Sequence, residues 1–171
     1  EIFVFIRPRR PLDGIILTLP IDVLRDESKI EAHAEDIFKK IFTFQREINF
    51  RLPIYLVITK TDMIEGFSEF SYMLNKTTKQ QIFGWSCPYS LNSVFSVSWI
   101  DEIFNTIRTG VRKATIHFAG TKKLSSNLEK AILFQTNLSK IRNSLSKYLL
   151  TMFKTHDPKD GLILRGVYFT G

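Results

Sequence analysis

The chain has 171 residues, of which 44% are hydrophobic and 24% charged, and its formal net charge is +7. This composition excludes a disordered chain, and the length fits one domain that buries a core. No run approaches the ~18 consecutive apolar residues of a membrane span, and no signal peptide is recognisable. The single Cys87 excludes an internal disulfide, and we predict that it is a small buried apolar residue.

The first distinctive segment is basic. Arg7, Arg9 and Arg10 form the densest cluster of positive charge, and Pro8 and Pro11 keep the segment extended. The cluster is suited to contact an acidic protein, phosphate or lipid headgroups. The alternative, which we favour, is a solvated link that leads into the first strand.

Residues 15–58 alternate between buried strand and amphipathic helix. Residues 15–19 form a continuous apolar run that stops at Pro20, which predicts a strand covered on both faces. Ser28 and Glu31 form a capping box, and the apolar stripe that follows predicts a helix up to residue 48, including Phe44. A second buried strand is predicted at residues 54–58. Strand, helix and strand make a βαβ unit, so the two strands should be parallel.

The second half of the chain is predicted to be mainly helical. Capping pairs at Ser98/Asp101 and Ser126/Glu129 each begin a helix, and the second helix is long, with a break near Asn137. The other predicted elements are two short helices, a loop or short strand, and a closing strand: residues 67–74, 77–82, 84–89 and 162–169.

The polar loop Thr59-Lys60-Thr61-Asp62 follows the second buried strand directly. In open α/β sheets, ligands bind beyond the carboxyl ends of parallel strands. In the base-selecting loop of a GTPase-like domain, the Lys stem lies over the base and the Asp carboxylate accepts hydrogen bonds from guanine. We therefore predict that Thr59, Lys60 and Asp62 are base-binding residues, retained or vestigial. The alternative is an ordinary polar turn.

The phosphate-binding side of such a site is missing from the sequence. No Gly is followed by Lys, as a P-loop requires, and no Asp is followed three positions later by Gly. The phosphate cradle and Mg²⁺ supply the catalysis in this class of enzyme. We therefore expect no nucleotide hydrolysis by this chain and predict no catalytic residues. His33, His117 and His156 are scattered, so no metal site is predicted either.

The fold class that follows is α/β: part of a P-loop-NTPase/GTPase-like domain, with a mostly parallel sheet, flanking helices and a helical extension. One domain of residues 1–171 would contain the βαβ part (1–92), the helical extension (93–160) and the terminal strand (161–171). Because the chain begins at Glu1 in an apolar run and stops in a strand-like run, we interpret it as a fragment.

Three blocks of sequence are distinctive in combination: RPRRPLDG running into IILTL at residues 7–19, YLVITKTD at 55–62, and LRGVYFT at 164–170. Together they resemble the IcmF/TssM family, in the family's order and over nearly the whole chain. Residues 66–70 and 83–86 also resemble family positions. Members are large inner-membrane proteins of bacterial type IVB (Dot/Icm) and type VI secretion systems.

The resemblance implies a cytoplasmic NTPase-like domain on the inner side of the bacterial inner membrane. A P-loop, in members that have one, would lie upstream of this segment. It also implies a small inner-membrane partner, DotU in type IVB systems or TssL in type VI systems. Only Thr59, Lys60 and Asp62 match functional positions, and Thr59 stands where GTPases have Asn, which argues against strict guanine selectivity. The Lys-, Phe- and Asn-rich composition slightly favours type IVB.

The first hypothesis for the function is therefore a scaffold that stabilises a secretion complex at the cytoplasmic face of the inner membrane. The alternative is a nucleotide switch in the intact protein, with GTP or ATP and Mg²⁺ as cofactors once an upstream P-loop completes the site. No cofactor is expected in this segment itself. A basic nucleic-acid binder is a third reading, but the Phe residues fall on core stripes rather than between basic residues.

Overall fold

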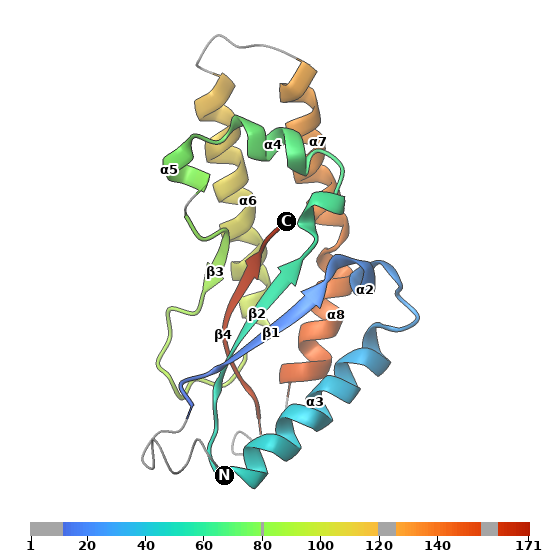
Figure 1. Cartoon of the computed structure of the whole chain (residues 1–171), viewed down its shortest axis with the longest axis vertical. Helices are drawn as coiled ribbons and strands as arrows, with labels where there is room; N and C mark the ends of the chain where they lie inside the picture. The colour runs from blue at the N-terminus through green and yellow to red at the C-terminus, as the bar shows by residue number, and fades with distance from the viewer. Residues whose placement is uncertain (1–11, 80, 120–125, 155–160) are drawn as a thin grey trace.

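The computed structural model of the chain describes residues 12–79, 81–119, 126–154 and 161–171 (Figure 1). The strands in this part are β1 (Ile15–Pro20), β2 (Pro53–Thr59), β3 (Gly84–Ser86) and β4 (Ile163–Phe169). The helices are α2 (Ile21–Arg25), α3 (Ile30–Glu47), α4 (Phe67–Met73), α5 (Lys76–Lys79), α6 (Ser98–Ala119), α7 (Ser126–Lys140) and α8 (Arg142–Phe153), with a 3-10 turn, η1, at Thr61–Met63.

The four described strands form one mixed sheet in the order β1-β2-β4-β3. β1 and β2 are parallel, with Ile15 opposite Ile54 and Pro20 opposite Thr59. β4 is parallel to β2, whereas β3 is antiparallel to β4. The α/β class and the parallel βαβ unit are thus confirmed, and the sheet is mostly parallel with one antiparallel strand at its edge.

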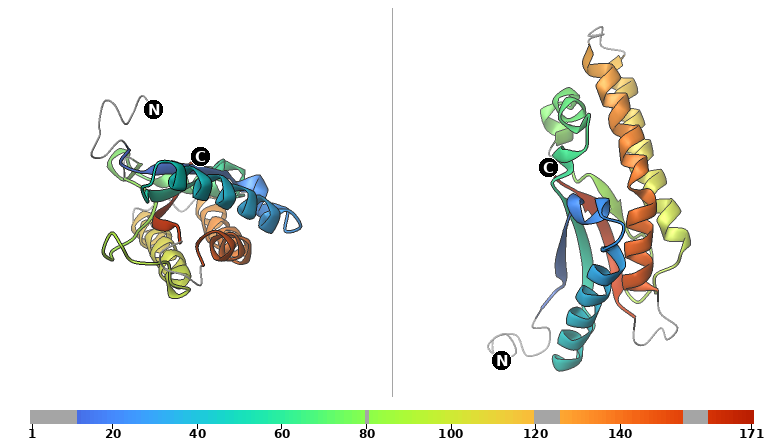
Figure 2. Two further views of the ribbon diagram at one scale, coloured as in Figure 1. Left: turned by 90° about the horizontal axis from the view of Figure 1, so that it is seen from below. Right: turned by 90° about the vertical axis from the view of Figure 1, so that its right-hand side faces the viewer.

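One face of the sheet forms the core. Along β2, Ile54, Leu56 and Ile58 are fully buried, and they are in register with buried side chains of β4. Helices α6, α7 and α8 lie on this side of the sheet, and α3 packs against α8 (Figure 2). Burial of these side chains supplies the main driving force for folding.

The other face of the sheet is not covered by any helix among the described residues (Figure 2). Ile16 on β1 is 73% exposed, and its neighbour across the strands, Tyr55 on β2, is only half-buried. Val57 and Tyr168 are half-buried on the same face. The sequence predicted strands covered on both faces, and in this segment they are covered on one.

A glycine sets the contact between α4 and α7. Gly66, which precedes α4, has φ +89°, and a Cβ added to it would lie 2.2 Å from the carbonyl oxygen of Lys130. Only glycine fits here, because both the backbone conformation and the space exclude a side chain. The approach lets Phe70 of α4 stack on Phe134 of α7, with ring centroids 5.0 Å apart.

The predicted cap of α3 is wrong. The Ser28 hydroxyl donates to the Asp26 carboxylate at 2.6 Å, and Glu31 pairs with Lys147 of α8 at 3.3 Å. No side chain caps the helix, which begins at Ile30. Both side chains bind partners other than the amides of the first helical turn. The Ser28/Glu31 pattern therefore predicted where the helix begins but not the contacts of these two side chains.

The apolar stripe of α3 is also corrected at its end. Phe44 is 39% exposed, and Gln45 takes the buried position beside it. The Gln45 side-chain carbonyl accepts a hydrogen bond from the backbone N–H of Leu52 at 3.1 Å. A polar side chain is buried here because it satisfies an amide of the turn that leads into β2.

The other two capping pairs and the helix break need similar corrections. Asp101 does not cap α6, because its carboxylate binds Arg142 at the start of α8. The side chain of Ser126 lies outside those that the structure describes. The long helix is broken as predicted, but at Ile141 rather than near Asn137. Asn137 instead stays in α7 and donates to the carbonyl of Glu65 at 3.3 Å.

Candidate functional site

The polar loop at residues 59–62, which we call the TKxD loop, lies at the carboxyl edge of the parallel strands, as the sequence predicted. Lys60 has left-handed backbone geometry with φ 59°, and η1 begins directly after it. Thr61 is fully buried, and its N–H donates to the carbonyl of Thr170 at 3.0 Å. Because Thr61 points inward, Lys60 and Asp62 on either side of it are both exposed.

The Lys60 ammonium is held by a residue that the sequence analysis missed. It donates to the carboxylate of Asp22 at 2.8 Å, and the hydrogen bond from Lys60 lowers the pKa of Asp22. Asp22 lies in α2, just beyond the end of β1. Since Pro20 stands opposite Thr59 in the sheet, parallel pairing of the two strands could have predicted this contact.

The other side of the loop faces the end of β4. A Cβ on Gly171 would lie 2.8 Å from the backbone nitrogen of Asp62, so the two backbones are in close contact. The N–H of Thr170 donates to the carbonyl of Ile58 at 2.9 Å, which continues the pairing of β2 and β4 past the strand ends. Thr170 and Gly171 therefore belong to the site, and their position at the end of the next parallel strand is the signal that indicates it.

The chemistry available at this edge is limited. The Asp62 carboxylate is an exposed hydrogen-bond acceptor, and Lys60 is an exposed cation that Asp22 already neutralises. Neither residue lines the pockets that we describe in this structure. Thr59 is half-buried at the end of β2. The edge thus offers an exposed carboxylate and a paired ammonium, and the base-binding role predicted for Thr59, Lys60 and Asp62 stays a prediction.

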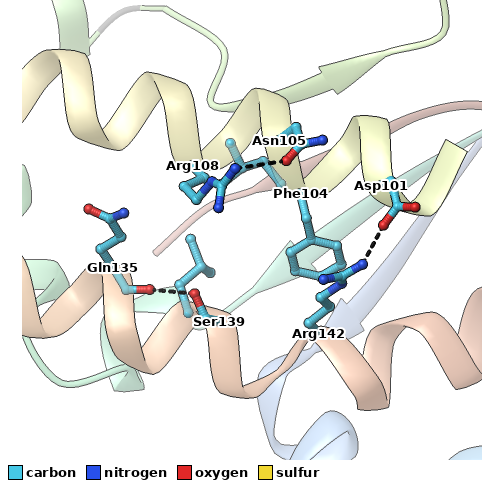
Figure 3. A pocket seen from close by; sticks show the side chains of 9 residues that line it. Asp101, Phe104, Asn105, Arg108, Gln135, Ser139 and Arg142 are labelled. Atoms are coloured by element: carbon cyan, nitrogen blue, oxygen red, sulfur yellow. Dashed lines mark hydrogen bonds and ion pairs between the residues drawn. The ribbon is translucent and has the colours of Figure 1, made fainter.

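A second candidate site is a pocket of about 210 Å³ between α6 and α7. Figure 3 shows that Arg142 reaches across it to the carboxylate of Asp101, and its guanidinium lies 5.8 Å from the ring centroid of Phe104. Arg108 donates to Asn105 of its own helix at 3.1 Å. Both arginines are thus bound to other side chains of the protein. The Arg142–Asp101 ion pair links α6 to the start of α8 beside this pocket.

A third polar cluster holds the loop after β3. The Arg165 guanidinium donates to three backbone carbonyls, those of Cys87, Tyr89 and Ser90, at 2.9 to 3.2 Å. Arg165 lies where the pairing of β4 with β2 shifts register, which frees its side chain to reach the loop. Cys87 is buried beside it, as predicted. The arginine of the LRGVYFT block therefore has a structural role.

The basic cluster and the histidines named in the sequence analysis remain to be placed. Arg7, Arg9 and Arg10 lie outside the described residues. His33 is a partner of the buried Tyr148, whose hydroxyl lies 3.3 Å from the His33 ring nitrogen, and burial raises the pKa of Tyr148. In the described ranges, no three His, Cys, Asp or Glu side chains come together as a metal site. None of the helices described there is long and apolar enough to span a membrane.

The fold and the loop define a class: an α/β domain with a parallel core, a TKxD loop at its carboxyl edge and a helical layer on one face. Residues 3–171 match the IcmF-related N-terminal domain, so the chain belongs to the IcmF/TssM family. It is 25% identical over 170 residues to the type VI secretion system component TssM1 of Pseudomonas aeruginosa. The match covers 96% of this chain and 15% of that relative. No solved structure matches the chain.

Proposed function

We propose that this chain is a scaffold segment of a type VI secretion component, and that it represents the second half of a GTPase-like domain with a helical extension. The observation that carries the proposal is the ion pair between Lys60 and Asp22. It pairs the Lys60 ammonium with a carboxylate just beyond the end of the neighbouring strand, so the charged end of this lysine is engaged within the chain.

The uncovered face of the sheet supports the half-domain interpretation. Sheets with parallel strands are normally covered by helices on both faces. Here the exposed Ile16 and the half-buried Tyr55 and Val57 form an apolar strip on the open face. The matched relative is more than six times longer than the aligned segment, since the match covers 15% of its length. Another part of the intact protein would then complete the fold.

The same proposal gives the location and the partner. The segment would lie at the cytoplasmic face of the bacterial inner membrane and stabilise the secretion complex by binding a small TssL- or DotU-like inner-membrane protein. The similarity to TssM1 favours the type VI system over the type IVB system. Family membership supports this assignment, and the basic net charge of +7 suits an acidic partner surface.

A nucleotide switch is the second candidate function, and one observation favours it. Asp62 keeps an exposed carboxylate, and the backbone of Thr170 and Gly171 lies directly beside it. Two adjacent strand ends therefore present a polar edge of the kind that reads a base. In this alternative an upstream P-loop of the intact protein would supply the phosphate site for GTP or ATP with Mg²⁺.

Calorimetric titration of the whole cytoplasmic region with GTP, GDP and ATP separates the two candidates. The scaffold proposal expects no heat with any of the nucleotides. The switch expects binding that Asp62→Ala abolishes and that Asp22→Asn preserves, because Asp22→Asn frees Lys60 without removing it. Co-purification with the TssL-like protein then tests the scaffold itself: the complex should survive Asp62→Ala, and its failure to form with the unmodified protein would contradict the proposal.

A further inference from the structure

The largest cavity that we describe in this structure is a groove of about 810 Å³, which Thr170 and Gly171 of the candidate site line but Lys60 and Asp62 do not. It is lined by α4, α5, α6 and the end of β4, and the side chains at its base are mainly aromatic. These are Phe67, Phe70, Phe83 and Phe169. At its edge, Ile82 is 80% exposed. An apolar cavity that opens beside an exposed large side chain is typical of an interaction surface.

The residues that α6 contributes to the groove include several small ones. Thr106, Gly110 and Ala114 line the groove at a spacing of four residues, so they form one row of small side chains along the helix. A glycine inside a helix costs about 1 kcal/mol relative to alanine. The packing of this chain does not require that cost, because a Cβ on Gly110 would have no neighbour within 4 Å. The row therefore leaves the backbone of α6 open to close approach from outside.

Three lysines lie on α5 and α6, which line the groove, and the exposed Asp62 lies beside Gly171, which also lines it. Among the described residues, Lys79 is the charged side chain that lines the groove. Lys76 at the start of α5 and Lys113, three residues after Gly110 on α6, are exposed on the same helices. None of these three lysines has an ion-pair partner within the part of the chain that the structure describes, whereas Lys130 on α7 is paired with Glu69 at 3.1 Å.

We propose that this groove binds an amphipathic helix of a partner protein, with its apolar face on the aromatic base and acidic residues on its flanks. The apolar base would receive side chains at positions i, i+3 or i+4 and i+7 of the partner helix. The small residues of α6 allow the two helix axes to approach each other closely. Acidic flanks would complement the unpaired lysines and raise the association rate. The proposal adds a partner surface to the scaffold role, and the groove shares Thr170 and Gly171 with the candidate site but not Lys60 or Asp62.

The direct test is selection of helical peptides by the 171-residue chain. The probe is a phage-displayed library of random peptides of about 16 residues, between four and five helical turns. The enriched peptides are expected to combine apolar residues at helical spacing with Glu or Asp on the flanks. Enrichment of basic peptides, or no enrichment at all, overturns the proposal.

Two variants at one position locate the binding. Gly110→Phe fills the groove and is expected to weaken binding of the selected peptide at least about tenfold, whereas Gly110→Ala leaves the groove open and should change the affinity less than about twofold. Lys79→Glu should weaken binding and reduce its salt dependence. Thermal unfolding of each variant confirms that the fold is intact. Equal affinity for the Gly110→Phe and Gly110→Ala proteins contradicts the assignment of the groove.

The outcomes also distinguish this proposal from the scaffold role. If no peptide is selected but the intact protein still co-purifies with its inner-membrane partner, the groove is not the docking surface and the scaffold role stands. If small hydrophobic fragments bind with an affinity that Gly110→Phe removes, while no peptide does, the groove is a small-molecule site and the helix proposal is wrong.

Discussion

The two faces of the sheet differ in how completely this segment covers them. On the helix-covered face, Ile54 is fully buried against the helical layer. Ile15 of β1 lies opposite Ile54, and the next residue, Ile16, lies on the open face and is 73% exposed. The same residue type is thus buried on one side of the sheet and mostly exposed on the other. The contrast indicates that the covered face supplies most of the apolar burial that stabilises the segment, and that the open face supplies little of it.

The largest loss of stability is expected from a side chain added where two helices are in close contact. Gly66→Ala forces a Cβ into the backbone of α7 at a residue with φ +89°, so we expect a loss of more than about 4 kcal/mol or failure to fold. Gly110→Ala is the matched control, because its Cβ meets open space and should stabilise the chain by about 0.5–1 kcal/mol. Urea unfolding measures both. A similar sign for the two changes would contradict the packing described here.

The comparison of the faces is tested directly by one substitution made on each. Ile54→Ala removes a fully buried side chain and should cost about 3 kcal/mol. Ile16→Ala removes a side chain that is mostly in water and should cost less than about 1 kcal/mol in the isolated chain. If the intact protein covers the open face, Ile16→Ala becomes more costly there. Equal losses in the isolated chain would show that the two faces do not differ.

A smaller effect is expected where the sheet meets the loop after β3. Arg165→Met removes the donor to three backbone carbonyls and should cost about 1–3 kcal/mol, because those carbonyls lose their partner. Arg142→Met is the control: it removes an ion pair whose partners are half-exposed, and it should change the unfolding free energy by less than about 1 kcal/mol. Hydrogen exchange should show faster opening of residues 87–90 only in the Arg165 variant.

The smallest effect concerns the exposed pair at the carboxyl edge, and it depends on pH. Because Lys60 lowers the pKa of Asp22 in the folded state, the pair stabilises the fold at pH values above the ordinary Asp value of 3.8. This contribution is lost as the pH falls through the lowered value. Asp22→Asn should therefore reduce the Tm slightly at pH 7 and not at all at the acid end. A difference from the unmodified chain that persists in acid would contradict the pairing.

The fold was predictable wherever the pattern of apolar residues alone decides the element. The apolar runs at residues 15–19 and 54–58 predicted two buried strands, and the helix between them required parallel pairing, which the structure confirms. The order of β4 and β3 was not predictable, because it is set by contacts between residues more than seventy positions apart. The sequence also did not predict that only one face of the sheet is covered, because a continuous apolar run does not show what packs against each face of the strand.

The polar contacts were less predictable than the elements. Glu31 and Asp101 each fit a capping pattern, yet both pair with basic residues of the helical layer, because the tertiary partner competes with the local amide. In the candidate site, the exposed positions of Lys60 and Asp62 followed from the strand end. Asp22, Thr170 and Gly171 required knowledge of which strand ends are neighbours.

The free edge of β1 has a consequence for handling the segment in isolation. β1 hydrogen-bonds to β2 on one side, and no other described strand pairs with it. Unpaired N–H and C=O groups along a strand that also carries an exposed isoleucine are a template for a second molecule. We therefore expect preparations of this segment alone to self-associate through β1 at high concentration, and a charged side chain in place of Thr18 to oppose it.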